Sequence, residues 1–294
     1  MTVSFSKNIK KILYLCRKND NNMNTRYKFN IDRLEVTYTC PKEIREFLAS
    51  IKDENICGMD NDVRVVRTAC TTYCHNFAVY CSNIYVGQLF FDTPNPNRPH
   101  IYLAADNRIL YTCAGGLSYI EQALHLSYYR ISKLDICLDS NINIINRFYR
   151  LLKDETQTII INNKIIKDRY AVINKLIHYS TGSLKNIRRN KSFILKGNEI
   201  ELVAYNKQQE IDNSSKKEYI KENLQLDKKI YRLEVRFTNF KQIQTALKLS
   251  CVDIEELYYF PFEDLFAQIF VSTLNRIIRF CNNKCILSYL LKII

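Results

Sequence analysis

The sequence predicts an α+β protein with an antiparallel central sheet, flanking helices and a helical C-terminal part. Short runs rich in Val, Ile, Tyr and Phe, broken by turn residues, fill most of the chain up to residue 105 and are typical of strands. Strands and helices alternate too irregularly for a doubly wound parallel sheet. Beyond residue 241 the apolar residues take helical spacing, which predicts helices there.

Each element follows from the same patterns. Strands are expected at 29–39, 62–67, 75–82, 84–92 and 100–105, and later at 129–139, 156–166, 192–204 and 229–238. Helices are expected at 41–51, where Pro41 suits a first helical turn, at 117–126 and at 142–153. A polar helix or loop is expected at 207–228. These elements divide the chain into a polar tail (1–27), an α+β core (28–240) and a helical region (241–294) packed on or extending that core.

The charge of the chain points to a polyanionic partner. A net charge of +13 over 294 residues favours nucleic acid, with an anionic membrane surface as the weaker alternative. The segment 169–198 carries seven Lys or Arg and no acid. Within it the expected DNA contacts are Lys185, Arg188, Arg189 and Lys191.

Several other classes of protein are disfavoured. No run of 18 apolar residues occurs, so no membrane-spanning helix is expected. No basic amphipathic helix dominates the sequence, so a membrane surface is the weakest alternative and no membrane partner is expected. The usual glycine-rich phosphate-binding loops are missing. The eleven cysteines lack the spacing of a zinc site and are expected to be reduced and packed as small apolar residues. These features fit a cytoplasmic protein.

Three segments share the pattern basic, Leu, acidic, β-branched. They are Arg33-Leu34-Glu35-Val36, Lys133-Leu134-Asp135-Ile136 and Arg232-Leu233-Glu234-Val235. A strand alternates its side chains between two faces, so each acid points away from its apolar neighbours. On adjacent strands Glu35, Asp135 and Glu234 would converge, and three carboxylates suit Mg²⁺ or Mn²⁺. The alternative is that each acid pairs with a basic residue on the polar face of the sheet.

A tyrosine at the end of an expected strand is a candidate nucleophile. On a continuing strand Tyr205 and Lys207 would face the same way, and a nearby ammonium favours the phenolate. Lys207 could also contact a phosphate. The alternative is an ordinary surface tyrosine in a chain that has twenty. Alternation further places Arg232 and Arg236 on the face of Glu234, where both arginines can clamp phosphates.

Four motifs, in this order, resemble those of rolling-circle replication initiators of small staphylococcal plasmids, with relatives in filamentous phages and integrative elements. The motifs are ISKLDICLD at 131–139, YSTGS at 179–183, YNKQQE at 205–210 and YRLEVR at 231–236. The resemblance implies nicking of one strand of a double-stranded DNA origin by a tyrosine, with a 5′-phosphotyrosyl intermediate and a free 3′-OH. It also implies that acids on the central sheet hold a divalent ion.

Carried over by position, the resemblance implies Tyr205 as nucleophile and Asp135 and Glu234 as metal ligands. Glu35 is added from the repeated strand pattern alone. Tyr179 is the alternative nucleophile. Members of the family usually have an arginine where this chain has Val203, which leaves phosphate contact to Lys207, Arg232 or Arg236.

The implied partners are the origin, the nicked single strand, and a host helicase and polymerase in the bacterial cytoplasm. Whether the protein forms a homodimer is left undecided by the sequence. Two other functions remain. One is a non-catalytic DNA-binding replication or copy-control protein on the same scaffold, which Val203 favours. The other is a conjugative relaxase, which would use similar chemistry for transfer.

Overall fold

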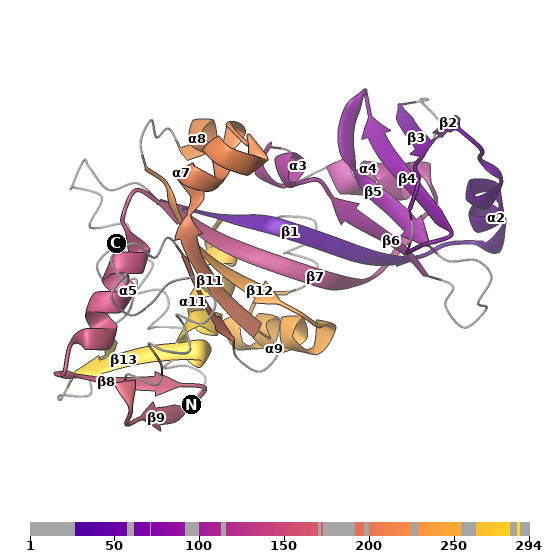
Figure 1. Cartoon of the computed structure of the whole chain (residues 1–294). Coiled ribbons are helices and arrows are strands. Elements are labelled where there is room, and N and C mark those ends of the chain that lie inside the picture. Colours follow the sequence, from indigo (N-terminus) through magenta and orange to yellow (C-terminus); the bar gives the residue numbers. More distant parts are fainter. Residues whose placement is uncertain are drawn as a thin grey trace.

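The computed structural model describes residues 27–57, 62–70, 72–91, 100–112, 116–169, 172, 192–196, 200–224, 229–253, 263–282 and 287–288. Within them, ten strands form one antiparallel sheet in the order β10-β11-β12-β7-β1-β6-β5-β4-β3-β2 (Figure 1). In chain order these strands are β1 (Tyr27–Thr39), β2 (Glu54–Cys57), β3 (Val63–Arg67), β4 (His75–Cys81), β5 (Ile84–Phe91), β6 (His100–Ala105), β7 (Ser127–Ser140), β10 (Ser192–Lys196), β11 (Ile200–Asn206) and β12 (Tyr231–Phe237). The predicted α+β class with a central antiparallel sheet is confirmed.

A second, four-stranded sheet has the order β14-β13-β8-β9. Its strands are β8 (Gln157–Ile161), β9 (Lys164–Ile166), β13 (Ile278–Asn282) and β14 (Leu287–Ser288). Figure 1 shows it below α5 (Ile144–Lys153), at one end of the molecule. Phe280 of β13 meets Phe148 of α5 edge to face, with the ring centroids 5.9 Å apart.

The remaining elements are helical. They are α2 (Lys42–Ser50), α3 (Asn107–Thr112), α4 (Gly116–Ala123), α5, α7 (Lys207–Glu210), the π-helix η3 (Ile211–Ser215), α8 (Tyr219–Leu224), α9 (Phe240–Ser250) and α11 (Glu263–Ile277). No helix among the described residues is long and apolar enough to cross a membrane.

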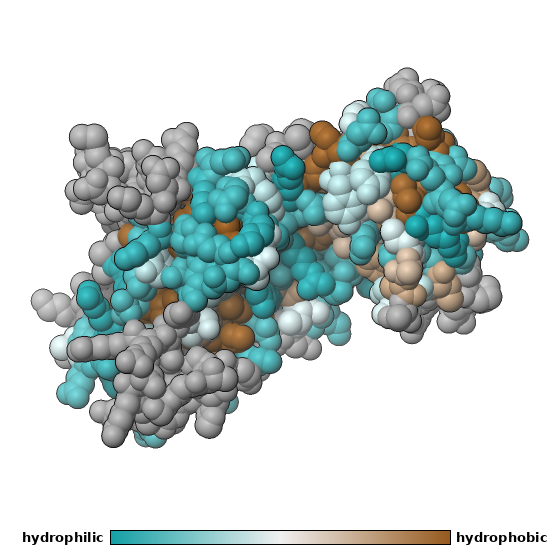
Figure 2. Space-filling view, turned by 45° about the horizontal axis from the view of Figure 1, so that its top comes forward, coloured by the Kyte–Doolittle hydropathy of each residue, from teal (hydrophilic) through white to brown (hydrophobic). Residues whose placement is uncertain are grey.

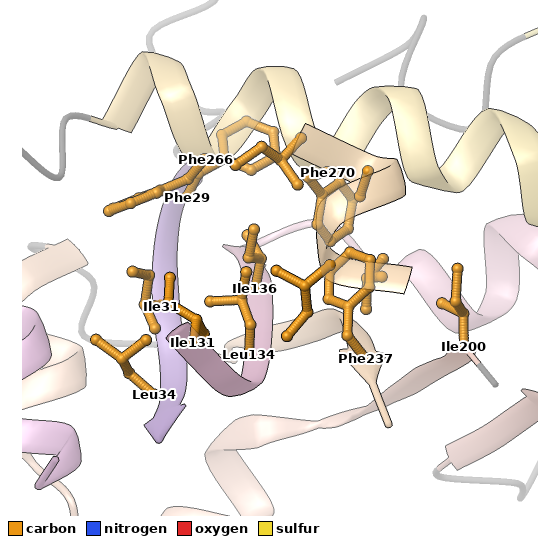
Figure 3. Close-up of a cluster of buried hydrophobic side chains, with 14 of the residues drawn as sticks. Phe29, Ile31, Leu34, Ile131, Leu134, Ile136, Ile200, Phe237, Phe266 and Phe270 are labelled. Atoms are coloured by element: carbon orange, nitrogen blue, oxygen red, sulfur yellow. The ribbon is translucent and has the colours of Figure 1, made fainter. Parts of the chain in front are cut away.

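The main core lies on one face of the large sheet. Inward-facing residues of β1, β7 and β12, such as Ile31, Ile136 and Phe237, are buried against α9 and α11. Figure 3 shows Phe266 and Phe270 of α11 lying over this apolar face. The rings of Phe29 and Phe270 meet edge to face at 5.4 Å. The opposite face carries the polar side chains, and at one end of it lie α3, α7 and α8 (Figure 1).

Local sequence explains where the helices begin. The side chain of Asn143 caps α5 by accepting a hydrogen bond from the Asn146 backbone N–H at 2.9 Å. Asn239 caps α9 in the same way through the Gln242 N–H at 3.0 Å. In α5 the residues at i, i+3 and i+4 spacing are buried, which explains why this segment forms an amphipathic helix.

Several boundaries differ from those predicted. The strand expected at 192–204 is two antiparallel strands, β10 and β11, paired with each other. The region 241–294 is not wholly helical, because after α11 the chain enters β13. There Ile278 and Phe280 are buried and pair with β8, an alternation that the helical spacing just before it obscures. Tyr27, placed in the predicted tail, already belongs to β1, and residues 1–26 lie outside the described residues.

Candidate active site

The three repeated motifs lie on adjacent strands, in the order β12-β7-β1. Asp135 of β7 stands between Arg236 of β12 and Arg33 of β1, while Glu35 of β1 stands opposite Lys133. Directly opposed residues share a face, and so do residues two apart on one strand. Glu35, Asp135 and Glu234 therefore lie on the same face, as the alternation predicts, and all three are buried.

The three acids have different surroundings. Glu35 accepts a hydrogen bond from the Lys133 ammonium at 2.7 Å, with Arg33 at 3.9 Å. Glu35 therefore follows the alternative prediction, in which the acid pairs with basic residues on the polar face of the sheet instead of binding a metal ion. Glu234 accepts two hydrogen bonds from Arg236, at 2.9 and 3.2 Å.

Of these three acids, Asp135 has the fewest interactions that offset its negative charge. Within the part of the chain that the structure describes, its carboxylate makes no hydrogen bond and no ion pair. Burial and the negative charge of Glu234 raise the pKa of Asp135 to about 7, against the opposing charges of Arg236 and Arg33. A cation between Asp135 and Glu234 would relieve this repulsion.

Asp135 and Glu234 are the two acids that could bind a divalent ion. Among the residues of the described ranges, no group of three or more His, Cys, Asp or Glu side chains is arranged to hold a metal ion. Mg²⁺ is commonly bound by only one or two carboxylates, with water and substrate phosphates completing its shell. Asp135 and Glu234 fit that donor set. Glu35 does not add to it, because its carboxylate is bound by Lys133.

Arg232 lies two residues before Glu234 but is enclosed. Its guanidinium is fully buried and donates to both oxygens of Asp139, at 2.6 and 2.7 Å. It also donates to Asp32 and to the phenol oxygen of Tyr111 on α3. The prediction that Arg232 contacts phosphate is therefore at odds with the structure, because two carboxylates and a helix close this guanidinium off.

Sequence reasoning gave no function to Asp32 or Asp139, the partners of Arg232. Asp139 lies opposite Arg232 in the strand register. Asp32 is an extra residue of β1 at a β-bulge between Ile31 and Arg33. The signal for the bulge was available, because Asp32 and Arg33 are consecutive polar residues in an otherwise alternating strand. Burial would raise the pKa of Asp32, but Arg232 and Lys207 outweigh it and lower the pKa to about 2.

Tyr205 lies opposite Arg232, and its neighbour two residues back, Val203, lies opposite Glu234. The phenol therefore shares the face of the acids and is diagonal to Glu234. Burial raises the pKa of Tyr205 well above its usual value; Arg232 opposes the shift and Glu234 adds to it. The expectation that a neighbouring cation favours the phenolate is wrong in this structure, because desolvation dominates.

Lys207 is not on a continuing strand. β11 ends at Asn206, whose side chain caps α7 by accepting from the Gln209 N–H at 3.1 Å. Lys207 is buried at the start of that helix and pairs with Glu210 at 2.6 Å. Its ammonium lies 5.6 Å from the centroid of the Tyr205 ring, so it contacts the ring face while Glu210 holds its charge.

Arg236 connects the parts of the site. Its side chain is 37% exposed and hydrogen bonded to Glu234, and its charge interacts with Asp135 and Tyr205. The candidate site is thus Tyr205, Glu234, Asp135 and Arg236, drawn from three neighbouring strands. Among the predicted residues, Tyr179, Lys185, Arg188, Arg189 and Lys191 lie outside the described residues.

No family model matches the chain. No curated protein matches it either.

Proposed function

We propose that this protein nicks one strand of DNA through Tyr205 and initiates rolling-circle replication of a phage or plasmid. One observation carries the proposal: the phenol of Tyr205 shares a sheet face with two repelling acids, Glu234 and Asp135, and with Arg236. A phenol, an acid pair suited to a divalent ion and a partly exposed guanidinium are the groups that phosphoryl transfer to tyrosine needs. The resemblance of the four motifs supplies the biological context.

In the proposed reaction the Tyr205 oxygen attacks the scissile phosphorus. A bond forms between that oxygen and phosphorus, and the bond from phosphorus to the 3′ oxygen breaks. The phenol proton leaves to water beside the partly exposed Arg236, and the departing 3′ oxygen takes up a proton as the free 3′-OH. Reversal of the same steps rejoins the strand.

Asp135 and Glu234 would hold the Mg²⁺ or Mn²⁺ ion, which when bound neutralises charge on the phosphate oxygens. In this proposal Arg236 contacts the phosphate, a role supported by its partial exposure, whereas Arg232 is buried. Arg236 takes the part that an arginine at the position of Val203 has in the family. Because the pKa of Tyr205 is raised, Arg236 and the phosphate-bound cation must favour the attacking oxygen at the moment of reaction.

The test is covalent capture. The full chain is incubated with a pool of random-sequence single-stranded DNA and an excess of Mg²⁺, and denaturant-resistant protein–DNA adducts are isolated. Sequencing of the captured DNA gives the cleavage site, and mass spectrometry of the nuclease-treated adduct gives the attached residue. The proposal expects a nucleotide on Tyr205, no adduct from Tyr205→Phe, and no adduct in EDTA.

Tyr231→Phe is the matched control. Tyr231 begins the neighbouring strand β12 but packs against the main core, so its hydroxyl is not expected to react. An adduct that persists in Tyr205→Phe, or that maps to Tyr179, overturns the assignment of the nucleophile.

A second candidate is a non-catalytic DNA-binding protein on this scaffold. Val203 and the raised pKa of Tyr205 favour it. It predicts DNA binding without any adduct, for the wild-type chain as for Tyr205→Phe.

A further inference from the structure

The polar sheet face that carries the candidate site continues beyond it onto β6 and β5. Glu35 lies opposite Ala104 of β6, and two residues along each strand Thr37 lies opposite Tyr102. Tyr102 in turn lies opposite Phe90 of β5. Since directly opposed residues share a face, Asp135, Glu35, Tyr102 and Phe90 all project from one side of the sheet.

Aromatic rings gather on this second half of the face. Phe90 and Tyr102 are stacked, with centroids 5.6 Å apart and planes at 16°. Tyr73 lies against both, at 4.4 Å from Phe90 and 6.3 Å from Tyr102. We call Tyr73, Phe90 and Tyr102 the aromatic platform. The rings of His100 and Tyr129 stack beside it at 4.6 Å, and Tyr129 is 51% exposed.

Two of the three rings of the aromatic platform reach solvent. Tyr73 and Tyr102 are partly exposed, whereas Phe90, on which they pack, is buried. Gln88, opposite Ala104 on the same face, is exposed. Figure 2 shows white, tan and brown side chains mixed with hydrophilic ones over the part of the molecule that holds β2–β6. The surface over α7 and α8 is mostly hydrophilic by comparison. The buried Phe90 supports the rings of Tyr73 and Tyr102, whose partly exposed surfaces are the part of the platform that a ligand can reach.

Positive charge lies between the platform and the site. The side chains of Arg33 and Lys133 are 54% and 41% exposed and flank the buried Glu35, so the three together carry one positive charge. On the far side of the platform, Arg64 lies over the Tyr80 ring at 4.5 Å. With a net charge of +13 on the chain, the path from platform to site is complementary to a phosphate backbone.

We propose that the aromatic platform binds unpaired bases of a DNA strand whose backbone runs past Arg33 and Lys133 toward Asp135 and Glu234. Aromatic rings beside cations are the general means of holding single-stranded nucleic acid, because every base offers a face for stacking. A duplex keeps its base faces stacked on one another, so the platform selects unpaired strand. The choice of DNA rests on the proposed nicking function, whereas the stacking itself does not depend on it.

Binding is measured apart from chemistry. A fluorescein-labelled dT₂₀ oligonucleotide is titrated with the full chain in EDTA, and the anisotropy gives Kd. Tyr102→Ala and Tyr73→Ala are each expected to weaken binding roughly tenfold, the effect of one lost base stack. Tyr102→Trp should retain binding. Arg33→Gln should lower the dependence of log Kd on log salt by about one.

The control is Phe47→Ala, which removes a 43% exposed aromatic from α2, a helix that packs into the core through Leu48 and contributes nothing to the platform. It should bind dT₂₀ as the wild type does, with an unchanged circular dichroism spectrum. Photo-cross-linking with 5-iododeoxyuridine in the oligonucleotide should attach to Tyr73, Tyr102 or Tyr129. Cross-links that fall elsewhere, or platform variants that bind like Phe47→Ala, overturn the proposal.

The two proposals fail separately. Cross-links at the platform without any covalent adduct on Tyr205 would retain the binding face and reject nicking. An adduct on Tyr205 with unaltered dT₂₀ binding by the platform variants would do the reverse. Tighter binding of rU₂₀ than of dT₂₀ would overturn the choice of DNA.

Discussion

Arg232 and Arg236 project from the same face of the same strand, yet they occupy opposite environments. Arg232 is fully buried between Asp139 and Asp32, and its charge is enclosed by α3 and its neighbours. Arg236 is 37% exposed and faces the carboxyl groups of both Glu234 and Asp135. The comparison teaches that alternation along a strand determines the face of a side chain, while what packs over that face determines its chemistry.

The helices over one end of the sheet account for the difference. The Tyr111 hydroxyl of α3 accepts from Arg232, and Asn107 of the same helix donates to Asp32 at 2.9 Å. The Tyr219 hydroxyl of α8 donates to Asn107 at 2.6 Å and so holds α8 against α3, the helix that packs over Arg232. The end of the face that holds Arg236 lies away from α3, α7 and α8 (Figure 1).

The largest expected effect comes from removing Arg232 from its cluster with Asp139 and Asp32. Arg232→Met leaves the buried Asp139 and the partly buried Asp32 without their cation, and the free energy of unfolding should fall by about 3–5 kcal/mol. Arg236→Met should cost less, about 2 kcal/mol, because water reaches that guanidinium although its partner Glu234 is buried. Urea denaturation of both variants measures the difference. Equal losses would remove the distinction between the two arginines.

The next largest effect is on the pH dependence of stability, in which Asp135 and Asp32 should have opposite signs. The pKa of Asp135 is raised in the folded protein from 3.8 to about 7, so the folded state holds the proton more tightly. Stability should therefore fall as pH rises from about 4 to 7, by up to about 4 kcal/mol, and stay low above pH 7. Asp135→Asn should be more stable than the wild type at pH 8 and equal to it near pH 4, as thermal melts would show. The exposed Asp53→Asn is the control.

Asp32 should show the opposite sign and a smaller effect. Its folded pKa is lowered from 3.8 to about 2, so its contribution is present above pH 4 and is lost as pH falls through 2. The contribution is about 2 kcal/mol. Asp32→Asn should flatten the acid limb of the melting profile between pH 4 and 2. A profile identical to that of the wild type there would mean that Arg232 does not hold this carboxylate.

The smallest effect tests the divalent ion. Mg²⁺ at ten times its Kd should stabilise the folded chain by about 1.4 kcal/mol, which raises Tm by about 3 °C in a chain of this size. Asp135→Asn and Glu234→Gln should lose that rise, whereas Glu35→Gln should keep it because Glu35 is occupied by Lys133. A Tm rise retained by both Asp135→Asn and Glu234→Gln would place the ion elsewhere.

Much of this could be predicted from local patterns. Alternation alone places Glu35, Asp135 and Glu234 on one face, and the repeated motif was enough to suggest that their strands are neighbours. Burial depth was not predictable, because it depends on α3 and α8, which come from distant parts of the chain. That is why Arg232 was taken for a phosphate contact, and why the pKa of Tyr205 was expected to fall rather than rise.

The aromatic platform was missed for a related reason. Tyr73, Phe90 and Tyr102 come from a loop and two strands, and each reads as one more aromatic residue in a chain rich in tyrosine. Only the register of β1, β6 and β5 shows that they share a side with the acids.

The bulge at Asp32 has a consequence for how this strand can change. Shortening a strand in mid-course ordinarily turns every later side chain over, so that its core residues meet water. Here Asp32 is supernumerary to the pairing, since Ile31 and Arg33 already oppose successive residues of β7. Removing it would leave Leu34, Val36 and Tyr38 facing inward. Asp32, the acid that binds Arg232, is thus an inserted residue. The strand could lose it, or gain it, without moving the core side chains of β1 to the solvent face.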